Sequence, residues 1–195
     1  MTLTKASPVK RTILIAFLIV PVLAMFGYAA ATYSSPSAAD PDLASLAKYR
    51  QWTLVNPTPQ LMEQAPANLC GRVTGREEGS PHLHKYISVF VNSIGRDQMM
   101  TKRNPKYPVG SMIVKEKLAT ADSTTPELLT AMIKREAGYN PESGDWEFLV
   151  LDGAASEIVE RGKLTRCSSC HLPYQNRDFI TRTYLPEKVS RGLKP

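Results

Sequence analysis

The sequence carries little excess charge of either sign once its first residues are set aside. Its formal net charge is +6, but three of the 24 Lys and Arg residues, Lys5, Lys10 and Arg11, precede the first apolar run. The other 21 stand against 18 Asp and Glu residues. This balance, without a pattern of basic and aromatic residues, gives no support for a nucleic-acid partner. The length of 195 residues and the 43% hydrophobic content fit one globular domain with an appendage.

Charge is absent altogether from Ile13 to Ala31. The run follows Lys10 and Arg11, and positive residues before an apolar stretch indicate an export signal whose N-terminus stays in the cytoplasm. Its length of about 19 residues is close to the 20 or so that span a bilayer. We interpret residues 1–31 as a signal anchor, with cleavage after Ala29-Ala30-Ala31 or Ser37-Ala38-Ala39 as the alternative.

This interpretation divides the chain into three parts and predicts its location. Residues 32–42 are rich in Ser, Ala and Pro, and we expect them to form a flexible spacer. Residues 43–195 would then form one domain in the periplasm, held at the cytoplasmic membrane by a single pass through residues 13–31. A cleaved signal would instead release the same domain into the periplasm.

Cysteine is scarce, because the chain has only three. Two of them lie in Cys167-Ser168-Ser169-Cys170-His171, the Cys-x-x-Cys-His pattern that attaches a c-type haem. Two thiols one helical turn apart add to the vinyl groups of the porphyrin, and the adjacent histidine binds the iron. The motif therefore predicts one covalently bound haem c, attached through Cys167 and Cys170, with His171 as the metal ligand.

Other chemistry also uses paired cysteines. The same pair could be a thioredoxin-type redox site, a plain disulfide, or half of a zinc site completed by Cys70, His82 or His84. If Cys167 and Cys170 bind haem, Cys70 has no part in that site. It is then either a buried, inert thiol or a metal ligand or lipidation site.

Long helical patterns are also missing, which favours an antiparallel sheet. Short segments rich in β-branched, aromatic and apolar residues predict strands at residues 86–92, 111–117, 128–134 and 146–151. Turn-forming residues 138–145 connect the last two strands. Alternation in the second strand gives it two faces, Met112-Val114-Glu116 and Ile113-Lys115-Lys117.

Helices are expected in three places. Asp42 precedes apolar residues at near-helical spacing and predicts a short capped helix. A polar segment at residues 95–103 could form a second helix, and residues 158–170 a third that presents the haem motif. The predicted fold class is therefore α+β: an N-terminal transmembrane or signal helix, then an antiparallel β-sheet domain with a C-terminal haem-bearing helix.

Several motifs in a fixed order lead to the haem motif and then to Asp178-Phe179. They are Val91-Asn92, Tyr107-Pro108-x-Gly110-Ser111, Val114-Lys115-Glu116, Met132-x-Lys134-Arg135, Gly138-Tyr139-Asn140-Pro141 and Gly144-Asp145-Trp146-Glu147-Phe148. Over residues 45 to 185 the chain thereby resembles the cytochrome P-460 family, which includes the cytochromes c′-beta. The resemblance implies a single haem between a C-terminal helix and the face of an antiparallel sheet. His171 would be the proximal ligand, and sheet residues would wall the distal pocket.

The resemblance also implies a role for Lys115. In the hydroxylamine-oxidising members of the family a lysine is cross-linked to the porphyrin, and Lys115 matches its place in the Val-Lys-Glu strand. The alternatives are a lysine near the haem without a covalent bond and a lysine that points to solvent from an edge strand. Hydroxylamine oxidation also needs a base. No carboxylate lies between His171 and Arg177, and strand alternation places Glu116 on the face opposite Lys115.

Three functional hypotheses remain open. The first is a redox-active haem pocket that binds or oxidises nitric oxide or hydroxylamine. The second is an electron carrier in a membrane respiratory or photosynthetic complex, or one that serves a soluble cytochrome, since an anchor raises the local concentration near such partners. A sixth iron ligand would favour the carrier, and the candidates are Met112, Met132, His82 and His84. The third is a structural subunit in which the haem only stabilises the fold.

Overall fold

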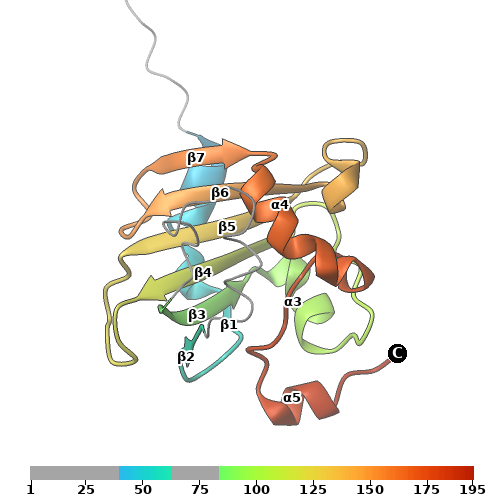
Figure 1. Ribbon diagram of the computed structural model, residues 1–195, viewed down its shortest axis with the longest axis horizontal. Helices are drawn as coiled ribbons and strands as arrows, with labels where there is room; N and C mark the ends of the chain where they lie inside the picture. The colour runs from blue at the N-terminus through green and yellow to red at the C-terminus, as the bar shows by residue number, and fades with distance from the viewer. Residues whose placement is uncertain (1–39, 63–83) are drawn as a thin grey trace, which may run out of the picture. The chain divides into compact units, whose positions relative to one another are not determined.

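An antiparallel sheet is the frame on which the other elements are placed. The computed structural model describes residues 40–62 and 84–195, and Figure 1 shows their arrangement. The longer strands lie side by side in chain order: β3 (Tyr86–Val91), β4 (Met112–Leu118), β5 (Leu128–Lys134), β6 (Trp146–Asp152) and β7 (Ile158–Gly162). Two short strands, β1 (Thr53–Leu54) and β2 (Gln60–Leu61), pair with the other edge of β3. The antiparallel sheet and the predicted α+β class are confirmed.

The helices are short. α1 (Pro41–Leu46) and the 3-10 helix η1 (Tyr49–Gln51) precede the sheet, α3 (Ser93–Met100) connects β3 to β4, and η2 (Pro141–Ser143) lies between β5 and β6. After β7 come α4 (Thr165–His171), η3 (Leu172–Arg177) and α5 (Glu187–Arg191). Within residues 40–62 and 84–195, no helix has the length and apolar character needed to cross a bilayer. The predicted apolar run, both cleavage sites and most of the spacer lie outside those ranges.

One prediction near the C-terminus was wrong. Residues 158–170 are not one helix, because residues 158–162 form β7, which pairs with β6 at the edge of the sheet. Ile158 and Val159 are β-branched and favour the extended backbone. Gly162 follows with a φ of 129°, which side-chain-bearing residues rarely adopt. The haem motif is therefore presented by a separate short helix, α4.

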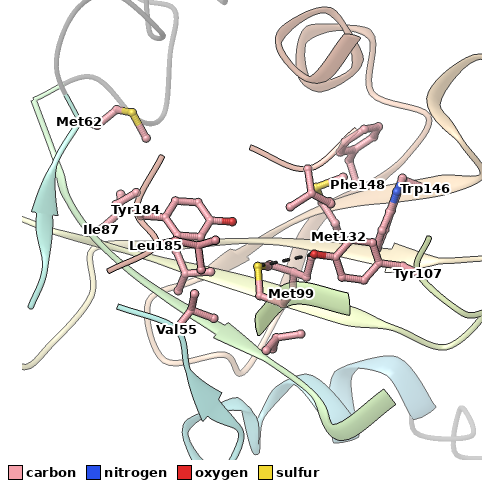
Figure 2. Packing of buried hydrophobic residues seen from close by; sticks show 14 residues of the cluster. Val55, Met62, Ile87, Met99, Tyr107, Met132, Trp146, Phe148, Tyr184 and Leu185 are labelled. Carbon is pink, nitrogen blue, oxygen red and sulfur yellow. Dashed lines mark hydrogen bonds between the residues drawn. The ribbon is translucent and has the colours of Figure 1, made fainter. Parts of the chain in front are cut away.

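The sheet separates two hydrophobic clusters. The α4-side cluster is drawn in Figure 2 and includes Met99, Tyr107, Ile113, Met132, Trp146, Phe148 and Tyr184, with Leu164 and Cys167 packed against it. The α1-side cluster includes Leu46, Tyr49, Phe90, Val114 and Leu149. Ile113 and Val114 are adjacent in β4, so successive side chains reach opposite clusters, and the predicted two faces of this strand are confirmed.

Glu116 anchors the N-terminal elements on the α1 side of the sheet. Its Oε1 accepts hydrogen bonds from the Tyr49 hydroxyl at 2.5 Å and from Arg50 Nε at 2.9 Å. The carboxylate is buried there, on the face of β4 opposite Lys115. Glu116 therefore stabilises the docking of η1, and it lies on the wrong face to act as a base beside a haem held by α4.

The start of α1 differs from the prediction by two residues. Asp40, not Asp42, caps the helix, because its Oδ1 accepts hydrogen bonds from the backbone N–H groups of Asp42 at 2.9 Å and Leu43 at 3.4 Å. Pro41 occupies the first helical position, where its lack of an N–H costs nothing. The Asp42 side chain is then available to pair with Arg135 and Arg161.

These two arginines join α1 to the sheet. Arg135 pairs with both Asp42 and Glu147, and Arg161 lies 2.7 Å from Asp42 and 3.0 Å from Glu147. Burial alone would raise the pKa values of the two carboxyl groups. Their hydrogen bonds and ion pairs with Arg135 and Arg161 outweigh burial and hold both pKa values below the usual range.

We expect the free energy of unfolding to decrease as the pH falls through about 4. Asp42 and Glu147 ionise at lower pH in the folded chain than in the unfolded chain. Their contribution is therefore complete above the unfolded pKa values and is lost as the folded carboxylates become protonated. Urea unfolding at several pH values measures this, and Arg135→Met should weaken the dependence while Arg166→Met, at an exposed pair, should not. An equal pH dependence in both variants would contradict the assignment.

Candidate functional site

Helix α4 places the Cys-x-x-Cys-His motif against the α4-side cluster. Cys167 is a free cysteine packed on that cluster, so the two cysteines of the motif do not form a disulfide with each other.

The zinc alternative gains no support from the residues that the structure describes. Within 40–62 and 84–195, no three His, Cys, Asp or Glu side chains gather as a metal site. His84 is an exposed turn residue. Cys70 and His82 lie outside the described residues, so their predicted roles are not tested.

His171 is oriented by a hydrogen bond that leaves one ring nitrogen available. Its Nδ1 lies 2.7 Å from the carbonyl oxygen of Phe179. Because a carbonyl can only accept, Nδ1 carries the proton and Nε2 keeps its lone pair. Metal-binding histidines commonly have this arrangement. The imidazole also lies near the sheet, with its centroid 5.5 Å from that of the Phe148 ring.

The Phe179 carbonyl is held in place by an unusual turn. Asp178 and Phe179 have φ values of 52° and 63°, so two successive non-glycine residues are left-handed. Such a conformation is unfavourable and persists only where surrounding contacts fix it. One contact is Gly144, where a Cβ atom would lie 2.7 Å from the Phe179 ring, which leaves no room for a side chain. The turn thus depends on a glycine of the β5–β6 connection.

Asp178 is the centre of the contacts that fix this turn. Its carboxylate accepts hydrogen bonds from Lys134 Nζ at 2.7 and 2.8 Å and from the backbone N–H of Tyr107 at 2.8 Å. Its carbonyl accepts one from Trp146 Nε1 at 2.8 Å. Asp178 and Lys134 are both largely buried, at 7% and 13% side-chain exposure. The sequence offered Asp178 only as a member of a motif, and the structure shows that residues of four separate motifs meet there.

Lys115 and Lys117 extend to the α4 side of the sheet and are both buried, at 6% and 1% exposure. Strand β4 is paired on both edges, so the alternative of a solvent-facing lysine on an edge strand is wrong. Burial lowers the pKa of Lys115 to about 8 and that of Lys117 well below its usual value. Burial and the charge of Lys115 lower the pKa of His171 to about 3, so its imidazole is neutral, as an iron ligand must be.

The two described methionine candidates for a sixth ligand lie on different faces of the sheet. Met132 is buried in the α4-side cluster, on the same side as Phe148. Met112 packs against the α1-side cluster, and the sheet separates it from α4. Of these two residues, only Met132 is on the side where a haem attached to α4 would lie.

The side chains on the α4 side suit a haem in both polarity and donor set. The face combines an apolar cluster with one imidazole whose Nε2 is available and a motif cysteine packed against it. Cys167, Cys170 and His171 would hold the group. Burial of the porphyrin against Phe148 and its neighbours would exclude water from one side of the iron.

Comparisons with known proteins agree with this assignment. A family model described as cytochrome P-460 matches residues 46–182, a range that contains strands β1 to β7, the haem motif and the Asp178-Phe179 turn. No curated protein matches the chain. Since the family model covers most of the chain, this protein belongs to the cytochrome P-460 family and is a haem-binding cytochrome.

Proposed function

We propose that this chain is a membrane-tethered, periplasmic cytochrome with one haem c, and that its haem pocket binds small nitrogen ligands, nitric oxide or hydroxylamine, in a redox reaction. The observation that carries the proposal is the pair formed by His171 Nδ1 and the Phe179 carbonyl, which leaves Nε2 for the iron. When bound, the iron supplies the change of redox state and a coordination position for the ligand.

Residues of this chain attach and position the haem. Cys167 and Cys170 attach the porphyrin, and His171 fixes the proximal side. Lys115, buried on the same side of the sheet, is the group proposed to meet the porphyrin edge and to carry the cross-link. Its Nζ lies 5.3 Å from the centroid of the Tyr184 ring, and no ion pair holds it within the described residues. The amine is therefore available to a bound group.

The ferrous absorption spectrum tests this assignment. A covalent bond from Lys115 to the ring should give the wild type an anomalous ferrous spectrum and a haem peptide that contains Lys115 after proteolysis. Lys115→Ala should then restore an ordinary spectrum, whereas Lys163→Ala, at an exposed lysine just before α4, should change nothing. An ordinary wild-type spectrum, with ligand binding unaffected by Lys115→Ala, would overturn hydroxylamine oxidation as the function.

An electron-transfer subunit is the second candidate, and Met132 favours it. Its side chain is buried on the haem side of the sheet, and methionine with histidine is the ligand pair of many carrier cytochromes. The same spectra separate the two functions, since methionine ligation gives a six-coordinate haem that does not bind nitric oxide readily. Met132→Ala would open the sixth position only in that case.

Tethering is tested by fractionation. The uncharged run at residues 13–31 should keep the haem protein in the membrane fraction after a carbonate wash, because an apolar helix of that length remains in the bilayer. A variant that begins at residue 32 behind a cleavable export signal should be recovered in the soluble periplasmic fraction. Recovery of a shortened, soluble protein from the full-length gene would show that the run is a cleaved signal.

A further inference from the structure

The α4 side of the sheet holds polar donors that lack acceptors. Within residues 40–62 and 84–195 the Lys115 amine has no hydrogen bond or ion pair, and Lys117 Nζ has a single hydrogen bond, to Thr130 Oγ1 at 3.0 Å. The Tyr184 hydroxyl has no hydrogen-bond partner, although the residue is fully buried. Lys117 Nζ and the Tyr184 hydroxyl thus have one hydroxyl acceptor between them among the described residues, and the Lys115 amine lies against the Tyr184 ring.

These groups come from two distant parts of the chain. Lys115 and Lys117 project from the same face of β4, where they pair across the strands with Val89 and Ile87 of β3. Tyr184 follows the Asp178-Phe179 turn, and its ring lies beside the Lys115 amine. In Figure 2 its hydroxyl points toward the middle of the α4-side cluster. The donors therefore gather on the haem side of the sheet.

Such a set is unfavourable unless something completes it. Buried amines and hydroxyls lose their hydrogen bonds to water, and folded proteins almost always replace those bonds. An apolar neighbour cannot do so, and a further donor would add to the problem. The missing group must be an acceptor, and negative charge would suit two adjacent amines best.

We propose that Lys117 and Tyr184, together with Lys115, form an anion site on the haem side of the sheet that takes a carboxylate or a small oxyanion. The inference rests on the proposed haem site. Two sources supply this chemistry: a propionate of the haem itself, or a free oxyanion such as nitrite that enters beside the iron.

Lys117→Met in the holoprotein tests the site, since it removes the amine and keeps a side chain of similar length. If a propionate occupies the site, the propionate bending modes in the resonance Raman spectrum should shift in the variant. If a free oxyanion does, the nitrite Kd should rise by roughly ten- to a hundredfold, the effect of one hydrogen bond to a charged group. Tyr184→Phe should move the same readout in the same direction.

Lys163→Met is the matched control and should leave both readouts unchanged. Lys117→Gln keeps a neutral donor of smaller reach and provides a second variant if Lys117→Met does not fold. A haem-containing protein in which Lys117→Gln and Tyr184→Phe alter neither the propionate modes nor the nitrite Kd would overturn the anion site alone. Absence of haem from the wild type would overturn the proposed function with it.

Discussion

Replacing Cys167 and Cys170 together with alanine, in a Lys115→Ala background that removes the proposed cross-link, is expected to leave the chain without covalently bound haem. The thioether bonds need both sulfurs, and a histidine alone does not retain haem through denaturation. The wild type should show a haem-stained band that follows the protein on a denaturing gel, and the double variant should show none. Ser168→Ala with Ser169→Ala, which changes the same helix between the cysteines, should keep the stain.

A haem-stained band in the double alanine variant that also carries Lys115→Ala would refute covalent attachment through this motif. The single variants add a finer measurement, because each leaves one thioether and one unreacted vinyl group. The pyridine haemochrome spectrum of each should then differ from that of the wild type.

Asp178→Ala is expected to lower the free energy of unfolding by about 3–5 kcal/mol, the usual effect of removing one member of a buried ion pair. The variant leaves the Lys134 amine without its carboxylate and the Tyr107 N–H without its acceptor. It also loses contacts that hold a left-handed turn, which alanine tolerates poorly. Urea unfolding monitored by tryptophan fluorescence gives the value.

Asp178→Asn removes the carboxylate charge but keeps a hydrogen-bond acceptor at this position, so it separates the two contributions to stability. Asparagine tolerates the left-handed conformation and can still accept from the Tyr107 N–H, so we expect a smaller loss than with alanine. Asp122→Asn, at an exposed loop position, should change the stability by less than about 0.5 kcal/mol. If Asp178→Ala is as mild as this control, the ion pair with Lys134 does not support the turn.

Local patterns of sequence were sufficient to predict the sheet and the two faces of β4. Alternation has a period of two, so Lys115 and Glu116 had to lie on opposite sides once the strand was recognised. The Cys-x-x-Cys-His pattern fixes the spacing of three side chains within five residues, and covalent haem attachment through it stays a prediction. The burial of Lys115 could not be predicted from the sequence, because it depends on which strands lie beside β4 in the sheet.

Contacts between distant residues could not be predicted in this way. The helix expected at residues 158–170 was wrong because pairing of Ile158 to Gly162 with β6 overrides the local pattern. Asp178 meets Lys134 across 44 positions, and no periodicity links them. Tyr184 lies in an irregular segment, and only the fold reveals that its hydroxyl is buried without a partner.

The separation of the two clusters by the sheet has a consequence for how this domain tolerates change. Trp146 and Glu147 are neighbours in β6, yet the first packs on the α4 side and the second joins the arginine pairs that hold α1. Substitutions on opposite sides share few partners, so their free-energy changes should be close to additive. The ion pairs that hold α1 against the sheet could then change over evolution, or be redesigned, while the spectrum and ligand affinity of the haem stay the same.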